Sequence, residues 1–137
     1  MNWQGVFAAI TTPFTLELEV DERFLAKHVD WLIDQGCTGI VPLGSLGEGA
    51  TLTREEKRRV ISICREAIDG RAALVPGIAA LSTAEASSLA REAESLDADG
   101  LMVLPPYVYR GDERETEAHF TQVIGASSLP AMLYNNP

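Results

Sequence analysis

Lysine is almost absent from this chain, which has two lysines among its 137 residues. Lys27 and Lys57 both fall in segments with helical periodicity, on or near the polar face, where an ammonium group stays solvated and protonated. A lysine that forms a Schiff base with a carbonyl compound needs a desolvated, deprotonated amine. Neither lysine is therefore a candidate for that chemistry.

Basic residues are few in general. The chain has 11 Lys and Arg residues against 20 Asp and Glu residues, which gives a net charge of -9. A field of this sign repels phosphate, so it argues against a general nucleic-acid partner and against binding to an anionic membrane. Any anionic ligand must be held by local donors.

Cysteines and long hydrophobic runs are also scarce. Cys37 and Cys64 are far apart and match no metal-ligand spacing, which favours two buried thiols in a reducing compartment over a disulfide or a metal site. No apolar run approaches the roughly 20 residues that span a bilayer, and the first residues lack the basic start of a signal peptide. We expect a cytoplasmic protein with no bound metal.

Short apolar runs recur roughly every 30 residues, which is the length of one strand–helix unit. None of them alternates polar with apolar residues, so we predict strands that are buried on both faces, as in a parallel sheet covered by helices. The five runs, each closed by Pro or Gly, are Val6–Ile10, Gly39–Val41, Ala73–Val75, Leu101–Leu104 and Ala131–Tyr134.

Helical patterns fill the gaps between these runs. An apolar stripe that includes Phe24 lies between Asp21, a predicted N-cap, and Gly36, a predicted C-terminal stop. Two further helices are predicted to begin with capping boxes, in which a hydroxyl and a carboxylate satisfy backbone N–H groups reciprocally. These boxes are Thr53 with Glu56 and Ser82 with Glu85, and a fourth helix is expected from about Asp112, burying Phe120, Val123 and Ile124.

The predicted order is strand–helix repeated four times, followed by a fifth strand. Two architectures fit this order: an open doubly wound sheet of five strands, or the first five strands of an eight-stranded barrel. A doubly wound domain normally has a last helix that covers its sheet, and none follows here. We therefore expect an α/β fold with one domain over residues 1–137, consisting of the N-terminal five strands and four helices of an incomplete (β/α)₈ TIM barrel.

Ligand sites of parallel α/β folds lie at the carboxyl ends of the strands. The segment GSLGE, residues 44–48, follows the second apolar run. Its glycines permit a tight turn in which the N–H groups of Ser45 and Leu46, with the Ser45 hydroxyl, converge on a small carboxylate. A plain strand-to-helix turn with Glu48 bonded to the backbone is the alternative, and spacing alone favours it.

Tyrosines follow the last two runs. Tyr134 is a candidate proton carrier or substrate-orienting residue, and a ring packed on the rim of the fold is an equally weighted alternative. Tyr107 and Tyr109 flank a Pro-Pro turn, which favours a surface or interface position. The two histidines, His28 and His119, lie in predicted helices and are expected to be structural.

The segment GSLGE, followed by ATLTREEK and by the terminal LYNNP, resembles the dihydrodipicolinate synthase / N-acetylneuraminate lyase family of pyruvate-dependent class I aldolases. The resemblance implies a (β/α)₈ barrel, usually a homodimer or tetramer without a cofactor, in which a lysine on the sixth strand forms an imine with pyruvate or a related 2-oxo acid. It implies that Ser45 helps to hold the substrate carboxylate and relays a proton, and that the Leu46 N–H is the second carboxylate donor. Tyr134 matches the family tyrosine that transfers protons at the keto oxygen.

This chain departs from dihydrodipicolinate synthases proper at two places. It has Ser45-Leu46 where they have two threonines, and it reads Tyr107-Val108-Tyr109 where they have a tyrosine pair that reaches across a dimer interface. Val108 thus replaces the second tyrosine, unless Tyr109 compensates. These departures support two expectations: dihydrodipicolinate synthase activity itself, and, at least equally, the activity of a related aldolase, lyase or dehydratase on another 2-oxo acid.

The resemblance also places the imine lysine about one strand–helix unit beyond Pro137. We therefore expect a partial enzyme that is inactive alone, and unstable alone because open apolar sheet edges need cover. The expected partners of the complete protein are a 2-oxo acid and an aldehyde, with no nucleic acid and no membrane. The rival hypothesis is a non-catalytic module of doubly wound type that binds a small carboxylate or another protein.

Overall fold

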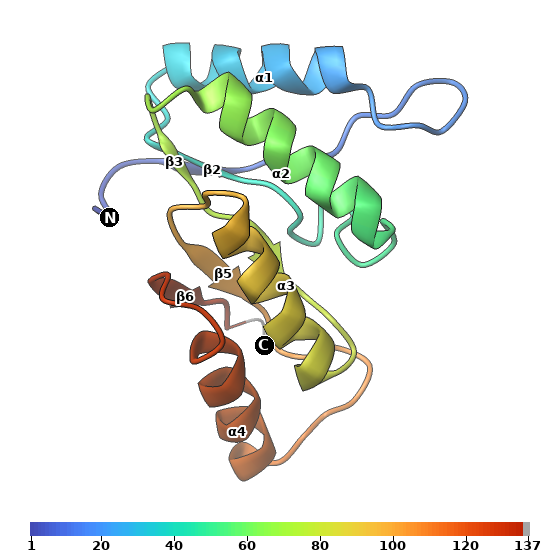
Figure 1. Ribbon diagram of the computed structural model, residues 1–137, viewed down its shortest axis with the longest axis vertical. Helices are drawn as coiled ribbons and strands as arrows, with labels where there is room; N and C mark the ends of the chain where they lie inside the picture. The colour runs from blue at the N-terminus through green and yellow to red at the C-terminus, as the bar shows by residue number, and fades with distance from the viewer. Residues whose placement is uncertain (136–137) are drawn as a thin grey trace.

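Strands and helices alternate along the chain in the computed structural model, which describes residues 1–135 (Figure 1). The helices α1 and α2 lie side by side in one half of Figure 1, and α3 and α4 in the other. The elements are β1 (Phe7–Ala9), α1 (Glu22–Asp34), β2 (Gly39–Val41), α2 (Arg54–Ile68), β3 (Ala73–Leu74), β4 (Gly77–Ile78), α3 (Thr83–Ser95), β5 (Leu101–Val103), α4 (Glu113–Ile124) and β6 (Ala131–Leu133).

All paired strands are parallel, as predicted. One sheet has the order β1-β2-β3 and the other β4-β5-β6. The register aligns Phe7 with Gly39 in the first sheet and Leu101 with Ala131 in the second. Neighbours in sequence are thus neighbours in space, which is the arrangement of successive units in a barrel wall.

A further strand, β4, follows β3 just beyond the third apolar run, so residues 1–135 contain six short strands where the sequence predicts five. Pro76 lies between the two and has no N–H to donate to a ladder. On one side of this segment, Gly77 N–H donates to Pro42 C=O at 2.8 Å; on the other, Met102 N–H donates to Pro76 C=O at 3.1 Å. Residues 73–78 therefore lie between β2 and β5 and join the two sheets.

Side chains of the central strands alternate between two hydrophobic clusters, because successive residues of a strand point to opposite faces. Ile40 and Leu101 belong to the larger cluster, which the helices cover, and Val41 and Met102 to the smaller one. The prediction of burial on both faces is confirmed for β2 and β5, whose residues are all buried. It is wrong for β1 and β6, which are partly exposed because each has one strand neighbour instead of two.

The first two helices begin where the sequence predicts. The Asp21 carboxylate accepts a hydrogen bond from Phe24 N–H at 2.9 Å, and Gly36 follows the helix with a φ of +95°. Thr53 and Glu56 form the full capping box, in which the Glu56 carboxylate accepts from Thr53 N–H at 2.7 Å. These bonds hold the pKa of Glu56 below its usual range.

The other two helices also begin where the sequence predicts, but their capping bonds differ from those expected. The Ser82 hydroxyl accepts from Glu85 N–H at 3.2 Å, but among residues 1–135 no reciprocal bond from Ser82 N–H to Glu85 completes the predicted box. Asp112 caps α4 and forms a full capping box with Glu115, neither of which is predicted from the sequence. The Glu115 N–H and the neighbouring Arg114 keep the pKa of Asp112 low.

Several side chains are more exposed than predicted. Phe24 is 57% exposed and stacks on His28, which stacks in turn on Trp31, along the outside of α1. Only Val123 of the predicted α4 trio is fully buried, with Phe120 and Ile124 packed at the edge of the core, and Cys37 is half-buried. Cys64 is fully buried, and both thiols are free.

Candidate active site

The loops that follow β1, β2, β4, β5 and β6 emerge at one edge of the strands, because all of these strands run parallel. This edge therefore receives the segments with Thr12, Ser45, Tyr107 and Tyr134. It is the edge at which barrel and doubly wound enzymes place their ligand sites.

Residues Gly44–Gly47 form a β-turn directly after β2. Gly47 N–H donates to Gly44 C=O at 3.0 Å, which places Ser45 and Leu46 at the two central positions of the turn. Within the described residues 1–135, the N–H groups of Ser45 and Leu46 donate to no backbone carbonyl. Both residues are exposed, Leu46 at 74%, so one turn at the surface carries two neighbouring backbone donors that no backbone carbonyl of residues 1–135 accepts from.

The connection from β2 to α2 is more elaborate than a plain turn. Glu48 N–H donates to Ser45 C=O at 3.3 Å, and Glu48 itself has a φ of +56°. Its backbone C=O accepts from Thr51 N–H at 2.9 Å and from Leu52 N–H at 3.2 Å. Glu48 is thus hydrogen-bonded to the backbone, as in the plain-turn alternative, and the bonds are made by its main-chain N–H and C=O groups.

Tyr134 directly follows β6 and continues its pairing with β5, since its N–H donates to Val103 C=O at 2.9 Å. The residue is 42% exposed. Asn135 is the last described residue, and Asn136 and Pro137 of the LYNNP motif lie outside the described residues.

Tyr107, Val108 and Tyr109 are all exposed after β5. The two tyrosines thus lie at the surface of residues 1–135, and their expected interface role stays a prediction. The Tyr109 hydroxyl donates to the Glu115 carboxylate at 3.2 Å, and the same carboxylate accepts from Asp112 N–H at 2.9 Å. Tyr109 is thus attached to the start of α4, whereas Tyr107 and Val108 present apolar surface.

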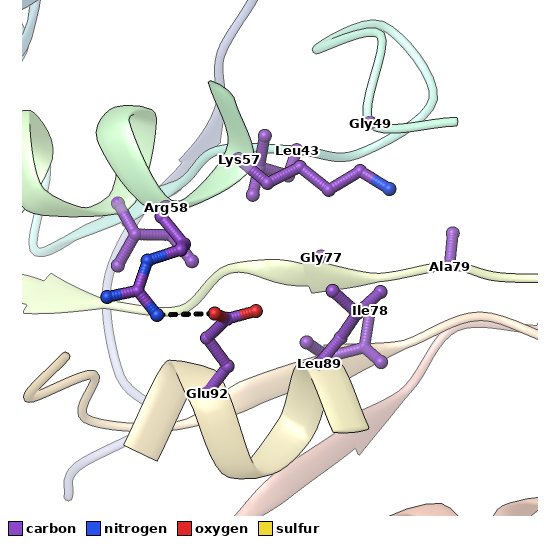
Figure 2. A pocket seen from close by; sticks show the side chains of 10 residues that line it. Leu43, Gly49, Lys57, Arg58, Gly77, Ile78, Ala79, Leu89 and Glu92 are labelled. Carbon is purple, nitrogen blue, oxygen red and sulfur yellow. Dashed lines mark hydrogen bonds and ion pairs between the residues drawn. The ribbon is translucent and has the colours of Figure 1, made fainter. Parts of the chain in front are cut away.

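A small cleft lies behind the turn, between α2, β4 and α3 (Figure 2). Lys57 lines this cleft and is half-buried, so its expected position on a solvated helix face is only partly correct. In Figure 2 the Lys57 side chain runs past Leu43 on the side of Gly49, and the Glu92 carboxylate points at Arg58. Sequence periodicity shows which face of its helix Lys57 occupies. It does not show that β4 and α3 form the other walls of the cleft beside it.

Thr12 lies at the same edge of the strands, but it is not among the site residues predicted from the sequence. Its hydroxyl donates to Gly47 C=O at 2.7 Å, and its side chain is buried. The TTP sequence after the first apolar run could have indicated Thr12, because it places a hydroxyl at the carboxyl edge of the strands. The partner at Gly47 becomes visible only in the folded chain.

No helix within residues 1–135 is long and apolar enough to cross a membrane. The same described residues contain no group of three or more His, Cys, Asp or Glu side chains placed to hold a metal ion.

The sequence profile of the Dihydrodipicolinate synthetase family matches residues 2–137. The chain belongs to this family. The resemblance based on GSLGE and LYNNP is therefore confirmed, and the barrel interpretation is favoured over a doubly wound domain.

Individual relatives agree with this assignment. The 4-hydroxy-tetrahydrodipicolinate synthase of Bartonella henselae is 39% identical over 134 residues, which are 98% of this chain and 46% of the relative. The structure of the enzyme of that name from Methylacidiphilum fumariolicum SolV matches with a TM-score of 0.95 and 34% identity, over 99% of this chain and 45% of the other. YagE, a prophage protein of the same family from E. coli whose structure is a complex with pyruvate, matches with a TM-score of 0.94 and 31% identity, over 98% and 45%.

This chain thus spans about half the length of the relatives that it matches. What it matches is the N-terminal portion of their α/β barrel, with four helices and parallel strands.

Proposed function

We propose that residues 1–137 form the N-terminal part of the catalytic barrel domain of a Schiff-base aldolase or lyase that acts on pyruvate or a related 2-oxo acid. The observation that carries this proposal is the exposed turn at Ser45 and Leu46 at the carboxyl edge of the strands, whose two N–H groups donate to no backbone carbonyl of residues 1–135. The pyruvate complex of the family member YagE supports the choice of a 2-oxo acid.

In this proposal the turn binds the substrate carboxylate. The N–H groups of Ser45 and Leu46 donate to its oxygens, and the Ser45 hydroxyl donates a third bond. Hydrogen bonds to an ionised acceptor are shorter and stronger than those between neutral groups. Because the net charge of the chain is -9, these local donors must offset a repulsive field.

Tyr134 acts as the proton carrier in the proposed site. Imine formation adds a lysine amine to the keto carbon, and the keto oxygen leaves as water after accepting protons, one of which Tyr134 transfers through the Ser45 hydroxyl. Lys27 on α1 and Lys57 on α2 belong to the outer helices. The imine-forming lysine is therefore assigned outside residues 1–137, and these residues alone are proposed to be inactive.

An aldehyde is the proposed second substrate of the complete protein, and a homodimer or tetramer is its proposed assembly. The exposed surface of Tyr107 and Val108 suits a contact between subunits, since isolated apolar groups are common on a surface but adjacent ones mark interaction sites. Because Leu46 replaces a threonine of dihydrodipicolinate synthases proper and Val108 a tyrosine, the proposed reaction extends to other 2-oxo acids.

Kinetics of the complete enzyme test this function with three substitutions and one control. Tyr134→Phe is expected to lower kcat by about 100-fold with little change in KM, since it removes a proton carrier. Ser45→Ala is expected to impair both binding and proton transfer, and Ser45→Thr to retain activity. Ser62→Ala on α2 serves as the control, and an effect of Ser45→Ala no larger than that of the control contradicts the proposal.

A further inference from the structure

Leu43 has a backbone conformation that is unusual for its residue type. It follows β2 and Pro42, has a φ of +64° and is 3% exposed, with its side chain in the main hydrophobic core. A branched residue with a positive φ is disfavoured, so the surrounding structure must hold it in place. The next residue, Gly44, begins the turn that presents Ser45 and Leu46, so the orientation of Leu43 sets the direction of the turn.

Two glycines lie against the carbonyl group of Leu43. A Cβ atom at Gly77 would lie 2.6 Å from Leu43 O and 3.0 Å from Gly44 N, and a Cβ atom at Gly49 would lie 2.2 Å from Leu43 O. The clashing atoms belong to the backbone, which cannot rotate away as a side chain can. Gly77 belongs to β4, a different strand, and its N–H donates to Pro42 C=O at 2.8 Å.

The far end of the turn is held by the β1 loop. The Thr12 hydroxyl donates to Gly47 C=O at 2.7 Å in a buried position. A Cβ atom at Gly47 would lie 2.9 Å from both Ile10 O and Leu43 N. The turn is therefore fixed at its start by Gly77 and at its end by Thr12, two residues that lie outside the GSLGE motif.

We infer that Gly77 and Thr12 are positioning residues for carboxylate binding: they fix the peptides of Leu43 and Gly47 so that the N–H groups of Ser45 and Leu46 point at one ligand. This inference rests on the function proposed above. Substrate affinity then depends on two features outside the turn: Gly77 on β4 has no side chain, and the Thr12 hydroxyl is buried against Gly47. Neither residue touches the ligand.

Pyruvate titration of the complete protein by calorimetry tests this role. Gly77→Ala forces the Leu43 peptide to move and is expected to weaken the pyruvate Kd by about tenfold, which corresponds to the loss of one hydrogen bond to a charged group. Thr12→Val is expected to weaken binding in the same direction, and Thr12→Ser to restore it.

The matched control is Gly39→Ala at the start of β2, where the atoms nearest the added Cβ belong to the Phe7 side chain, at 2.1 Å, and not to the Leu43 carbonyl group. It is expected to lower the Tm while leaving the Kd within about twofold of the original. Wild-type affinity in Gly77→Ala, or an equal loss in Gly39→Ala, overturns the inference.

Spectra of unliganded protein labelled with ¹⁵N-leucine and ¹⁵N-serine separate this inference from the proposed function. If the unsubstituted protein does not bind pyruvate, the proposed function fails, and the positioning role is judged from these spectra alone. Movement of the Ser45 and Leu46 amide signals in Gly77→Ala but not in Gly39→Ala supports it, and unchanged signals in Gly77→Ala overturn it.

Discussion

Arg58 on α2 donates a hydrogen bond to the carboxylate of Glu92 on α3, with 2.5 Å between Nη1 and Oε1. Arg54 adds a second bond to the same carboxylate at 3.0 Å, and the Glu92 side chain is only 6% exposed. This ion-pair cluster links α2, which follows β2, to α3, which follows β4. It therefore connects the two three-stranded sheets on their outer side (Figure 1).

Removing the charge of Glu92 is expected to destabilise the fold. Glu92→Gln should lower the free energy of unfolding by about 2 kcal/mol, below the full cost of breaking a buried pair because the two arginines remain hydrated. Urea unfolding measures the change. Glu22→Gln is the control, since Glu22 pairs with Arg59 on the surface. An equal loss in both variants contradicts the role of burial.

The stability of the fold should fall at mildly acidic pH because of His119. This imidazole is 4% exposed, with Nδ1 2.9 Å from the Thr83 hydroxyl oxygen. Burial lowers its pKa below the ordinary 6.5, and the Leu104 backbone offsets this only in part. The unfolded chain thus binds a proton at a higher pH than the folded chain, so the contribution is complete above about pH 6.5 and is lost as the pH falls through the folded pKa.

Thermal unfolding between pH 8 and pH 5 measures this contribution. This pH range extends about 1.5 units above and below the pKa of an unperturbed imidazole. His119→Asn is expected to reduce the decline of Tm toward acid, because asparagine does not titrate in this range. His28→Gln removes the other imidazole as a control. A Tm profile for His119→Asn with the original slope would show that other groups cause the decline.

Cys64 should be chemically inert until the chain unfolds. Burial raises the pKa of its thiol to about 12, and its side chain is fully enclosed. The reactive thiolate is therefore rarer than at an ordinary thiol by a factor of about 1,000. Alkylation with iodoacetamide followed by peptide mass mapping is expected to modify Cys64 only in urea. Native modification at a rate comparable to that of half-buried Cys37 contradicts the packing of α2.

The two predicted capping boxes should differ in strength. Thr53→Ala removes the two bonds of the Thr53 hydroxyl, which donates to the Glu56 carboxylate and accepts from Glu56 N–H, and is expected to cost about 1 kcal/mol. Ser82→Ala removes one bond of 3.2 Å and is expected to cost less. Urea unfolding at neutral pH compares the two variants, and a larger loss for Ser82→Ala runs against this ranking. The Thr53 effect should also shrink in acid, because the bond from the Thr53 hydroxyl to the Glu56 carboxylate lowers the pKa of Glu56 and weakens once that carboxylate is protonated.

Local signals made the helices predictable. Asp21 and Thr53 cap their helices as expected, and α4 starts near Asp112 as expected, because a helix start depends on residues within one turn of it. The strand count was not predictable in the same way. Pro76, which has no N–H, separates β3 from a further strand beyond the third apolar run, and the pairing of these two strands depends on β2 and β5.

The position of the proposed turn was predictable from its motif, whereas the contacts that hold the turn in place were not. The GSLGE motif identifies Ser45 and Leu46, and the structure presents them on an exposed turn. The contacts of Gly77 with Leu43 and of Thr12 with Gly47 join residues more than 30 positions apart. Strand register sets such pairs, and periodicity within one segment contains no information about it.

The central claim is that this chain supplies the carboxylate-binding turn of a Schiff-base enzyme whose lysine lies elsewhere. Incubating the complete protein with pyruvate and borohydride, followed by peptide mass mapping, tests it directly because borohydride converts an imine to a stable amine. The account predicts one reduced adduct on a lysine outside residues 1–137, and a weaker yield of it in Ser45→Ala. An adduct on Lys27 or Lys57, or no adduct on any lysine, would contradict it.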